Sequence, residues 1–400
     1  MRGTRAVIHL DNLQNNILEI KKFLAPKTKL CVAVKANAYG HGAVECARTA
    51  LACGADFLAV AAVDEGLELR KARIKAPVLL LSLCSPDEVD AAVRNNLTPL
   101  VFDEEYISLF AEAAGAAGKK SYPVHLAVDT GMGRIGCEPH EAGKIARAVA
   151  DTGALCVGGI CTHFAVSDEV STKSRDFTGT QFRLFEQAIK SVEAQGIDPG
   201  IRHCCNSAAT IDHPEFHLDM VRPGIIVYGY YAEEISKEYL EKKGTPLNLK
   251  PVMTLQTVVS AVRHFEEGKS AGYGRTWTAG VPTDIAVLPI GYGDGWARRF
   301  ALNGIPVSIN GKEYPVRGRI CMDQCMVDVG SDAANGIVRR WDKVILFGAK
   351  EDGALQTADD VAKLTGTISY EITSCITSRV PREFIGGRQD TGPRNKDKRA

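Results

Sequence analysis

Long apolar runs are absent from this 400-residue sequence, and no stretch approaches the roughly 20 apolar residues that a membrane-spanning helix needs. An excess of one charge sign is also missing, because 48 Lys and Arg residues balance 48 Asp and Glu residues. The charge balance therefore points to neither nucleic acid nor an anionic membrane as a partner. The first residues, MRGTRAVIHL, lack the apolar core of a signal peptide. We therefore expect a soluble, cytoplasmic protein.

Paired cysteine spacings are missing as well, although the chain has 12 cysteines. No C-x-x-C occurs, Cys204 and Cys205 are adjacent, and three residues separate Cys321 from Cys325. Because a structural zinc site needs paired short spacings, we expect no metal. Scattered cysteines in a chain of this size are typical of buried thiols in a reducing compartment, which agrees with a cytoplasmic location.

Short apolar segments recur along the first part of the chain, and most precede a polar or glycine turn and a helical pattern. They lie at 30–34, 57–62, 77–82, 98–102, 123–128, 156–161, 201–205 and 217–221. Such alternation of strand and helix, eight times in about 240 residues, is typical of a (β/α)8 barrel. A doubly wound sheet is disfavoured because no G-x-G-x-x-G follows the first strand. We predict a TIM-type barrel over residues 1–245.

The pattern changes near residue 246. Segments rich in Val, Ile and Thr follow, separated by turn signals, at 252–263, 283–290, 305–309, 314–329 and 343–348. They predict a mostly antiparallel β domain over residues 246–386, with one helix at 358–365 that Thr357 caps. The tail 387–400 is polar and has no apolar face, so we expect it to be disordered.

A lysine ends the first predicted barrel strand, in the stretch VAVKANAYGHG at 32–42. Such a lysine is either a cation that snorkels to the surface or an amine held for covalent chemistry, typically a Schiff base. The motif alone leaves both interpretations open. Because barrel active sites lie at the carboxyl ends of the strands, the side chains at those ends are the candidates for function.

Basic and polar side chains follow five of the predicted strands: Lys35, Asp129 to Arg134, His163, Asn206 with Ser207, and Arg222 to Gly224. Structural explanations exist for several of them. His163 can be a hydrogen-bonded core histidine, and Arg134 can pair with Asp129 across a glycine-rich loop. Asn206 and Ser207 can be only a helix N-cap. Their coincidence at strand ends instead favours a site for an anionic, covalently bound ligand whose phosphate meets backbone donors.

The chain resembles the alanine racemase family, fold-type III enzymes that use pyridoxal 5′-phosphate (PLP), from Ile8 to about Phe384. Eight motifs carry the resemblance in order: VAVKANAYGHG, DTGMGRIG, THFA, CNSAAT, VRPGIIVYG, AGYGRTW, PIGYGDGW and RGRICMDQCMVDV. The resemblance implies PLP-dependent interconversion of L-alanine and D-alanine, with D-alanine supplied to peptidoglycan. It also implies a head-to-tail homodimer.

The resemblance further implies roles for single residues. Lys35 would carry PLP as a Schiff base, and Tyr273 would reach the site from the partner subunit as the second base. The positions that would contact the cofactor are Lys35, Tyr39, Arg134, His163, Asn206, Ser207, Arg222, Gly224 and Ile225. Arg134 and Met322 would meet the substrate carboxylate. Tyr292, Arg298 and Arg319 would line the corridor by which substrate reaches the site.

The chemistry of racemisation agrees with these roles. A proton leaves one face of Cα and another returns to the opposite face, so two groups on opposite faces are needed. Lysine and tyrosine ordinarily stay protonated near neutral pH, so the site must favour deprotonated Tyr273, with Arg222 acting through His163. Arginine keeps its proton in proteins, so a PLP ring nitrogen facing Arg222 would stay largely unprotonated, which discourages transamination.

Two positions depart from the family pattern. Ala127 stands where many members carry a lysine that becomes carbamylated, so Arg134 must be oriented by Asp129, an ordered water or a bound anion. Ser378 stands where some members carry a pocket tyrosine, and a smaller polar residue there would admit serine beside alanine. A serine or broad-specificity racemase is therefore the alternative.

More distant alternatives have less support. PLP-dependent decarboxylases of similar fold usually carry three successive glycines for the phosphate and an acidic partner for the ring nitrogen, and this chain has neither. Non-catalytic PLP-binding barrels lack a second domain, whereas this chain has one.

Overall fold

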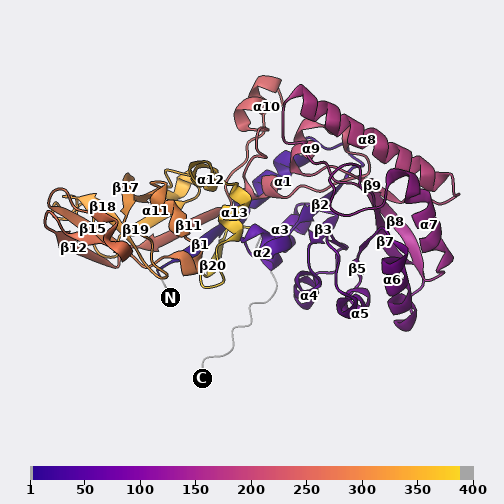
Figure 1. Cartoon of the computed structure of the whole chain (residues 1–400), viewed down its shortest axis with the longest axis horizontal. Helices are drawn as coiled ribbons and strands as arrows, with labels where there is room; N and C mark the ends of the chain where they lie inside the picture. Colours follow the sequence, from indigo (N-terminus) through magenta and orange to yellow (C-terminus); the bar gives the residue numbers. More distant parts are fainter. Residues whose placement is uncertain (1–2, 388–400) are drawn as a thin grey trace.

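The computed structural model describes residues 3–387, which form an α/β barrel and an elongated β domain (Figure 1). The barrel strands are β2 (Lys29–Ala33), β3 (Phe57–Val60), β4 (Val78–Leu80), β5 (Leu97–Thr98), β6 (Leu100–Val101), β7 (Tyr122–Ala127), β8 (Leu155–Cys161), β9 (Ile201–His203) and β10 (Met220–Val221). Each predicted segment overlaps an observed strand. The segment at 98–102 belongs to two short strands that Pro99 separates, because proline has no N–H for the ladder.

The barrel strands run parallel in the orders β10-β2-β3-β4-β5 and β6-β7-β8-β9. Backbone hydrogen bonds join these sheets on both sides: His125 N donates to Pro99 O and Arg222 N donates to Cys205 O, both at 2.9 Å. Strands such as β2 are apolar throughout their buried part because both faces of a parallel sheet are covered. The predicted barrel is confirmed.

Helices surround the barrel (Figure 1), and each contributes apolar side chains to the buried core. They are α1 (Leu10–Lys21), α3 (Ala43–Ala52), α4 (Val63–Lys71), α5 (Pro86–Arg94), α6 (Glu104–Ala116), α7 (Ala142–Asp151), α8 (Thr172–Glu193), α9 (Ser207–Asp212) and α10 (Lys237–Lys243). Within residues 3–387, no helix combines the length and apolar character needed to cross a membrane. The same residues contain no group of three or more His, Cys, Asp or Glu side chains placed to hold a metal ion.

The β domain is built on a nine-stranded sheet of order β12-β15-β18-β17-β16-β19-β11-β1-β20. Its strands are β1 (Arg5–His9), β11 (Met253–Val258), β12 (Ala261–Phe265), β15 (Thr283–Leu288), β16 (Pro306–Ile309), β17 (Lys312–Arg317), β18 (Cys325–Gly330), β19 (Lys343–Phe347) and β20 (Arg382–Ile385). Only the pair of β1 with β20 is parallel among these described strands. The predicted antiparallel domain is therefore confirmed.

Local details refine the predicted β domain. Helix α12 (Ala358–Thr365) begins after Thr357, whose hydroxyl accepts from Asp360 N at 3.3 Å, as the sequence indicates. The stretch 314–329, predicted as one run, is instead interrupted between β17 and β18 by the loop 318–324.

The first strand connects the two parts of the molecule. Residues 5–9 lie within the range predicted for the barrel, yet β1 pairs with β11 and β20 in the other sheet. Chain order alone cannot reveal this pairing because the partners are more than 240 positions away in sequence. The predicted disordered tail, 387–400, lies outside the described residues apart from Gly387.

Candidate active site

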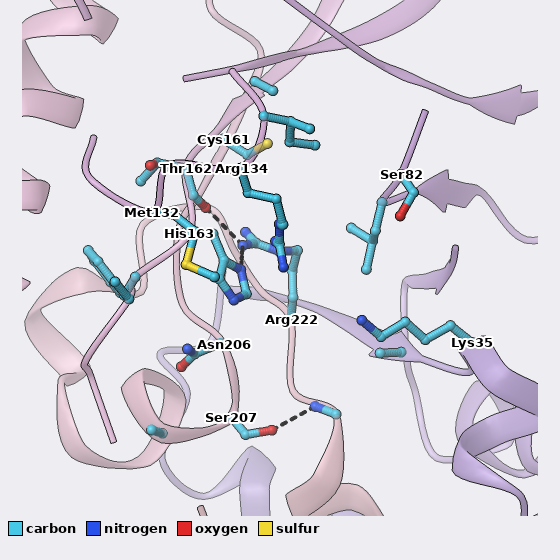
Figure 2. Close-up of a pocket in the computed structure, with 18 of the residues that line it drawn as sticks. Lys35, Ser82, Met132, Arg134, Cys161, Thr162, His163, Asn206, Ser207 and Arg222 are labelled. Carbon is cyan, nitrogen blue, oxygen red and sulfur yellow. Dashed lines mark hydrogen bonds between the residues drawn. The ribbon is translucent and has the colours of Figure 1, made fainter. Parts of the chain in front are cut away.

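A cavity of about 340 Å³ opens at the carboxyl ends of the barrel strands (Figure 2). Eight of the nine positions predicted to contact the cofactor line it: Lys35, Tyr39, Arg134, His163, Asn206, Ser207, Arg222 and Gly224. The ninth, Ile225, follows Gly224 and is fully buried. The structure thus brings together residues that span almost 190 positions of sequence.

Lys35 lies two residues beyond β2, at the start of a left-handed turn. The turn consists of four successive residues with φ between 51° and 55°: Ala36, Asn37, Ala38 and Tyr39. L-residues rarely adopt this conformation, and the sequence analysis did not predict it. The Lys35 side chain is half-buried and points into the cavity (Figure 2).

The surroundings of Lys35 favour its neutral amine. Burial lowers the pKa of Lys35, the Arg134 and Arg222 guanidinium groups lower it further, and the Glu65 carboxylate partly opposes them. A neutral amine is the form that attacks a carbonyl or accepts a proton, so the site favours a chemically active lysine.

Arg222 is held by a chain of buried hydrogen bonds. Its Nη1 donates to His203 Nδ1 at 2.7 Å, and its Nη2 donates to Thr162 O at 2.9 Å (Figure 2). Because arginine can only donate, the proton of His203 lies on Nε2, which donates to His125 Nδ1 at 2.8 Å. The Arg222 Nε–H has no hydrogen-bond partner within residues 3–387, so this donor is available to a ligand in the cavity.

The two histidines in this series of hydrogen bonds, His125 and His203, favour their neutral forms. Burial, with a contribution from the Arg222 charge, lowers the pKa of His125 to about 3 and that of His203 well below its ordinary value. Sequence analysis missed both residues. A signal existed, because a polar side chain within each of two apolar strand segments requires a buried partner.

His163 occupies the wall beside Arg222. Its Nδ1 lies 3.4 Å from Arg222 Nη2 (Figure 2). Burial, Arg222 and then Arg134 and Lys35 lower the pKa of His163 to about 3. His163 is therefore a neutral acceptor, placed as predicted next to Arg222.

Hydroxyl and backbone groups gather at another part of the cavity. Gly224 N donates to Ser207 Oγ at 2.8 Å (Figure 2). A Cβ at Gly224 would lie 2.4 Å from the Tyr39 hydroxyl, so any larger residue there would have to displace the Tyr39 side chain. Asn206 lines the cavity and also caps α9, because its Oδ1 accepts from Ala209 N at 3.0 Å. Asn206 is therefore both the N-cap of α9 and a residue of the cavity wall.

Tyr370 was not predicted and reaches the cavity from the C-terminal domain. It lies on α13 (Ser369–Ser374), and its ring meets that of Tyr39 edge-on with centroids 5.8 Å apart. Ser378, by contrast, is exposed and lines neither this cavity nor the hollow described below. In this chain, the serine therefore does not enlarge the cavity, and Tyr370 supplies a tyrosine to the wall.

The loop that carries Arg134 is organised differently from the prediction. Asp129 Oδ1 accepts from Gly131 N at 2.9 Å and from Gly133 N at 3.1 Å. Among the ion pairs of the described residues, none joins Asp129 to Arg134, so the structure contains no direct pair between these two side chains. The carboxylate instead shapes the glycine-rich loop, and Ala127 lies at the cavity wall.

The positions predicted to come from a partner subunit lie elsewhere, on the β domain. One hollow is lined by Gly272, Tyr273, Tyr292, Cys321, Met322, Asp323 and Gln324. Tyr273 is 69% exposed and Met322 is 52% exposed. The exposed Arg319 lies close by, since a Cβ at Gly274 would be 3.0 Å from its Nη1. The exposed Arg298 begins α11 (Arg298–Leu302).

No residue lines both the barrel cavity and this hollow. One chain therefore brings the cofactor positions together and brings Tyr273, Tyr292 and Met322 together, but it keeps the two groups apart. Lys35 lines the barrel cavity, whereas Tyr273 of the same chain lines the separate hollow on the β domain.

Comparison with known proteins identifies the family. The family model described as alanine racemase, N-terminal domain, matches residues 8–232, and that for the C-terminal domain matches residues 252–384. An alanine racemase of Treponema denticola is 48% identical over 387 residues, which cover 96% of this chain and 99% of the relative. One of Desulforamulus reducens is 45% identical over 383 residues, which cover 95% and 98%.

Solved structures agree with the sequence relatives. The alanine racemase of Bacillus anthracis, solved with bound L-Ala-P, has a TM-score of 0.87 and 35% identity, with 96% of both chains covered. That of Clostridium difficile 630 has a TM-score of 0.86 and 35% identity, again with 96% of both chains covered. Matches of this extent in both domains leave one conclusion: the chain belongs to the alanine racemase family.

Proposed function

We propose that this chain is a PLP-dependent alanine racemase that works as a homodimer. Lys35 of one subunit and Tyr273 of the partner subunit would transfer protons at opposite faces of the substrate. The observation that carries the proposal is the split site, with a buried, basic cavity at the barrel and an exposed Tyr273 on the β domain.

The residues of the barrel cavity fit PLP. Lys35 offers an amine whose pKa is lowered by burial to the aldehyde, and the Arg222 Nε–H offers an unused donor to the ring nitrogen. The hydroxyls of Tyr39 and Ser207 offer donors to the phosphate beside Gly224, in a cradle that a Cβ would fill. When bound, PLP supplies an electron-withdrawing ring that acidifies the Cα–H of an amino acid attached to it.

The residues of this chain then control the proton. Lys35 Nζ takes or returns the proton on one face of Cα, helped by the burial that lowers its pKa. Arg222 is fixed by hydrogen bonds to His203 and the Thr162 carbonyl. Because arginine keeps its proton in proteins, Arg222 does not protonate the ring nitrogen. An unprotonated ring nitrogen would make the cofactor a weaker electron acceptor. That strength would suffice for racemisation and would disfavour transamination.

Proton transfer on the second face of the substrate Cα requires a group that the barrel of the same chain does not supply. Tyr273 bears a hydroxyl and stands 69% exposed beside Met322, on a surface where a second copy can bury both. In a head-to-tail pair, the partner subunit's Tyr273 would reach the cavity, and the backbone N–H of the partner subunit's Met322 would meet the substrate carboxylate together with Arg134. Tyr292, Arg298 and Arg319 would line the corridor to the site.

The cell compartment is part of the same proposal. No disulfide joins the cysteines within residues 3–387, which agrees with a reducing cytoplasm. There the enzyme would supply D-alanine, and complementation of a D-alanine auxotroph tests that role.

The direct test is racemisation of L-alanine and L-serine, measured separately in D2O with purified protein and added PLP. Loss of the Cα–H signal reports proton exchange, and optical rotation reports inversion. Fast exchange with inversion on alanine and little on serine would support the proposal. Comparable rates on both would favour the broad-specificity alternative, and no exchange on either would overturn the two-base proposal.

A further inference from the structure

Glu65 contacts the ends of two neighbouring barrel strands. It is the third residue of α4, and its Oε2 accepts from Ala61 N at 2.8 Å and Ala62 N at 3.2 Å, just after β3. Its Oε1 accepts from Ala36 N at 2.6 Å, just after β2. A glutamate at this helix position ordinarily bonds only to its own helix start. Glu65 therefore does more than cap α4, because it ties α4 to the neighbouring strand end.

The amide that Glu65 holds is the one directly after Lys35. Ala36 is also the first residue of the left-handed turn, with φ of 51°. Each L-residue in that region is disfavoured, so four in succession persist only where the surroundings fix them. Asn37 Oδ1 accepts from Ala43 N at 2.8 Å, and His41 Nδ1 contacts Ala38 O at 2.9 Å, which holds the later part of the turn. Glu65 holds its beginning.

The charge of Glu65 also acts on Lys35. The other groups that shift the Lys35 pKa are its own burial and the Arg134 and Arg222 guanidiniums, and all of them lower it. Glu65 is the anion that opposes them. Removing this carboxylate must therefore move the Lys35 pKa further down.

We propose that Glu65 is a positioning residue for Lys35, because its hold on the Ala36 amide fixes the left-handed turn and thereby the direction of the lysine amine. The inference rests on the proposed function only in taking Lys35 as the site of PLP attachment. The hold on the turn does not depend on which amino acid is the substrate.

The chain contains a matched control. Glu88 is the third residue of α5, and its Oε2 accepts from Ser85 N at 2.8 Å and from Ser85 Oγ at 2.9 Å. Like Glu65 it is half-buried and caps a barrel helix, but its hydrogen bonds stay within its own helix start. Glu88→Gln therefore removes a helix cap and its charge without touching the end of a neighbouring strand.

The test compares Glu65→Gln with Glu88→Gln in the full chain loaded with PLP. Amide hydrogen exchange of the peptide 35–42, followed by mass spectrometry, reports the turn, and the pH midpoint of the absorbance of PLP linked to lysine reports the charge. We expect Glu65→Gln to speed exchange in 35–42 at least about tenfold and to move the midpoint to lower pH. It should also lower kcat for alanine more than it changes KM. Glu88→Gln should leave all three unchanged.

Glu65→Asp separates the two effects and serves if the glutamine variant does not fold. It keeps the charge but shortens the reach, so the pH midpoint should return towards that of the wild type while exchange in 35–42 stays fast. Exchange in 35–42 that is the same in Glu65→Gln, Glu65→Asp and wild type would overturn the inference. Fast exchange in the variants of a protein that does not racemise alanine would support the inference and contradict the proposed function.

Discussion

The barrel cavity and the Tyr273 hollow differ in how far a single chain completes them. In the cavity, Arg222 is 7% exposed and His203 is fully buried, and both make short hydrogen bonds to fixed partners. In the hollow, Tyr273 is 69% exposed. Under the proposed function, the first region would already be arranged to hold a cofactor, whereas the second would gain its function only when another surface covers it. The difference supports the proposal that the complete site contains parts of two chains.

The largest expected effect comes from removing the central group of the cavity. Lys35→Ala removes both the amine to which PLP attaches and one proton-transferring group, so kcat should fall by at least about 10³-fold. Borohydride trapping followed by mass spectrometry should no longer place PLP at residue 35. Near wild-type turnover in this variant would show that Lys35 in the barrel cavity does not take part in the reaction.

The hollow should respond in a different way. Tyr273→Phe removes one hydroxyl and keeps the ring, so PLP should still bind and Lys35 should still exchange the Cα proton on its own face. We expect solvent exchange to persist for one enantiomer of alanine while inversion falls by at least about 10²-fold. Equal loss of exchange for both enantiomers would place Tyr273 in binding rather than in proton transfer.

Arg222 tests the selectivity that the cavity imposes. Arg222→Glu would place a carboxyl group, which can protonate the ring nitrogen, where the arginine stands. The fraction of turnovers that end in keto acid should therefore rise by about tenfold or more. Arg222→Lys, which keeps the positive charge, is the control and should change this fraction less. Coupled detection of pyruvate measures the product directly, and an unchanged fraction in the glutamate variant would contradict the role of Arg222.

Gly224 tests how closely the cavity is fitted. Gly224→Ala adds a Cβ that would lie 2.4 Å from the Tyr39 hydroxyl, so the affinity for PLP should fall about tenfold. Gly115→Ala on α6 is the matched control, because a Cβ there meets nothing within 4 Å. Fluorescence titration of the apoprotein with PLP gives both affinities. Equal affinities in the two variants would show that phosphate donors do not converge at Gly224.

The smallest effect concerns the pH dependence of stability. Unfolded histidine has a pKa near 6.5, while burial lowers the pKa of His125 to about 3, so the unfolded chain binds this proton more tightly. Stability from neutral His125 is present above about pH 6.5 and is lost as pH falls towards 3. His125→Gln keeps an acceptor for His203 and should reduce the loss of unfolding free energy between pH 6 and 5 by about 1 kcal/mol. Urea unfolding measures it, with exposed His140→Gln as a control that should match wild type.

The barrel and the position of Lys35 could be predicted because local sequence determines them. Parallel strands buried on both faces appear as short apolar runs, and the residue after such a run lies at the strand end where barrel sites form. The β domain was predictable for a related reason, since its alternating segments and turn signals are also local. Thr357 illustrates this, because its hydroxyl caps the helix that follows at once.

Long-range pairings and rare backbone conformations could not be predicted in the same way. The hydrogen bond from His203 to His125 joins residues 78 positions apart, and Tyr370 arrives from the second domain. The left-handed turn after Lys35 contains alanines, which do not favour that conformation, so only contacts such as that of Glu65 with Ala36 explain it. Asp129 shows the competition between local and distant partners, because its carboxylate accepts from the amides of the glycine-rich loop and forms no ion pair with Arg134 within the described residues.

The central claim is that each complete site combines Lys35 of one chain with the partner subunit's Tyr273. Co-expression of Lys35→Ala and Tyr273→Phe chains carrying different tags tests it directly. Random pairing makes about half of the dimers mixed, and each mixed dimer holds one native site of two, so about a quarter of wild-type activity should return. Mixed dimers isolated through both tags should racemise alanine although neither parent does. Isolated mixed dimers with no more activity than the parents would contradict the shared site.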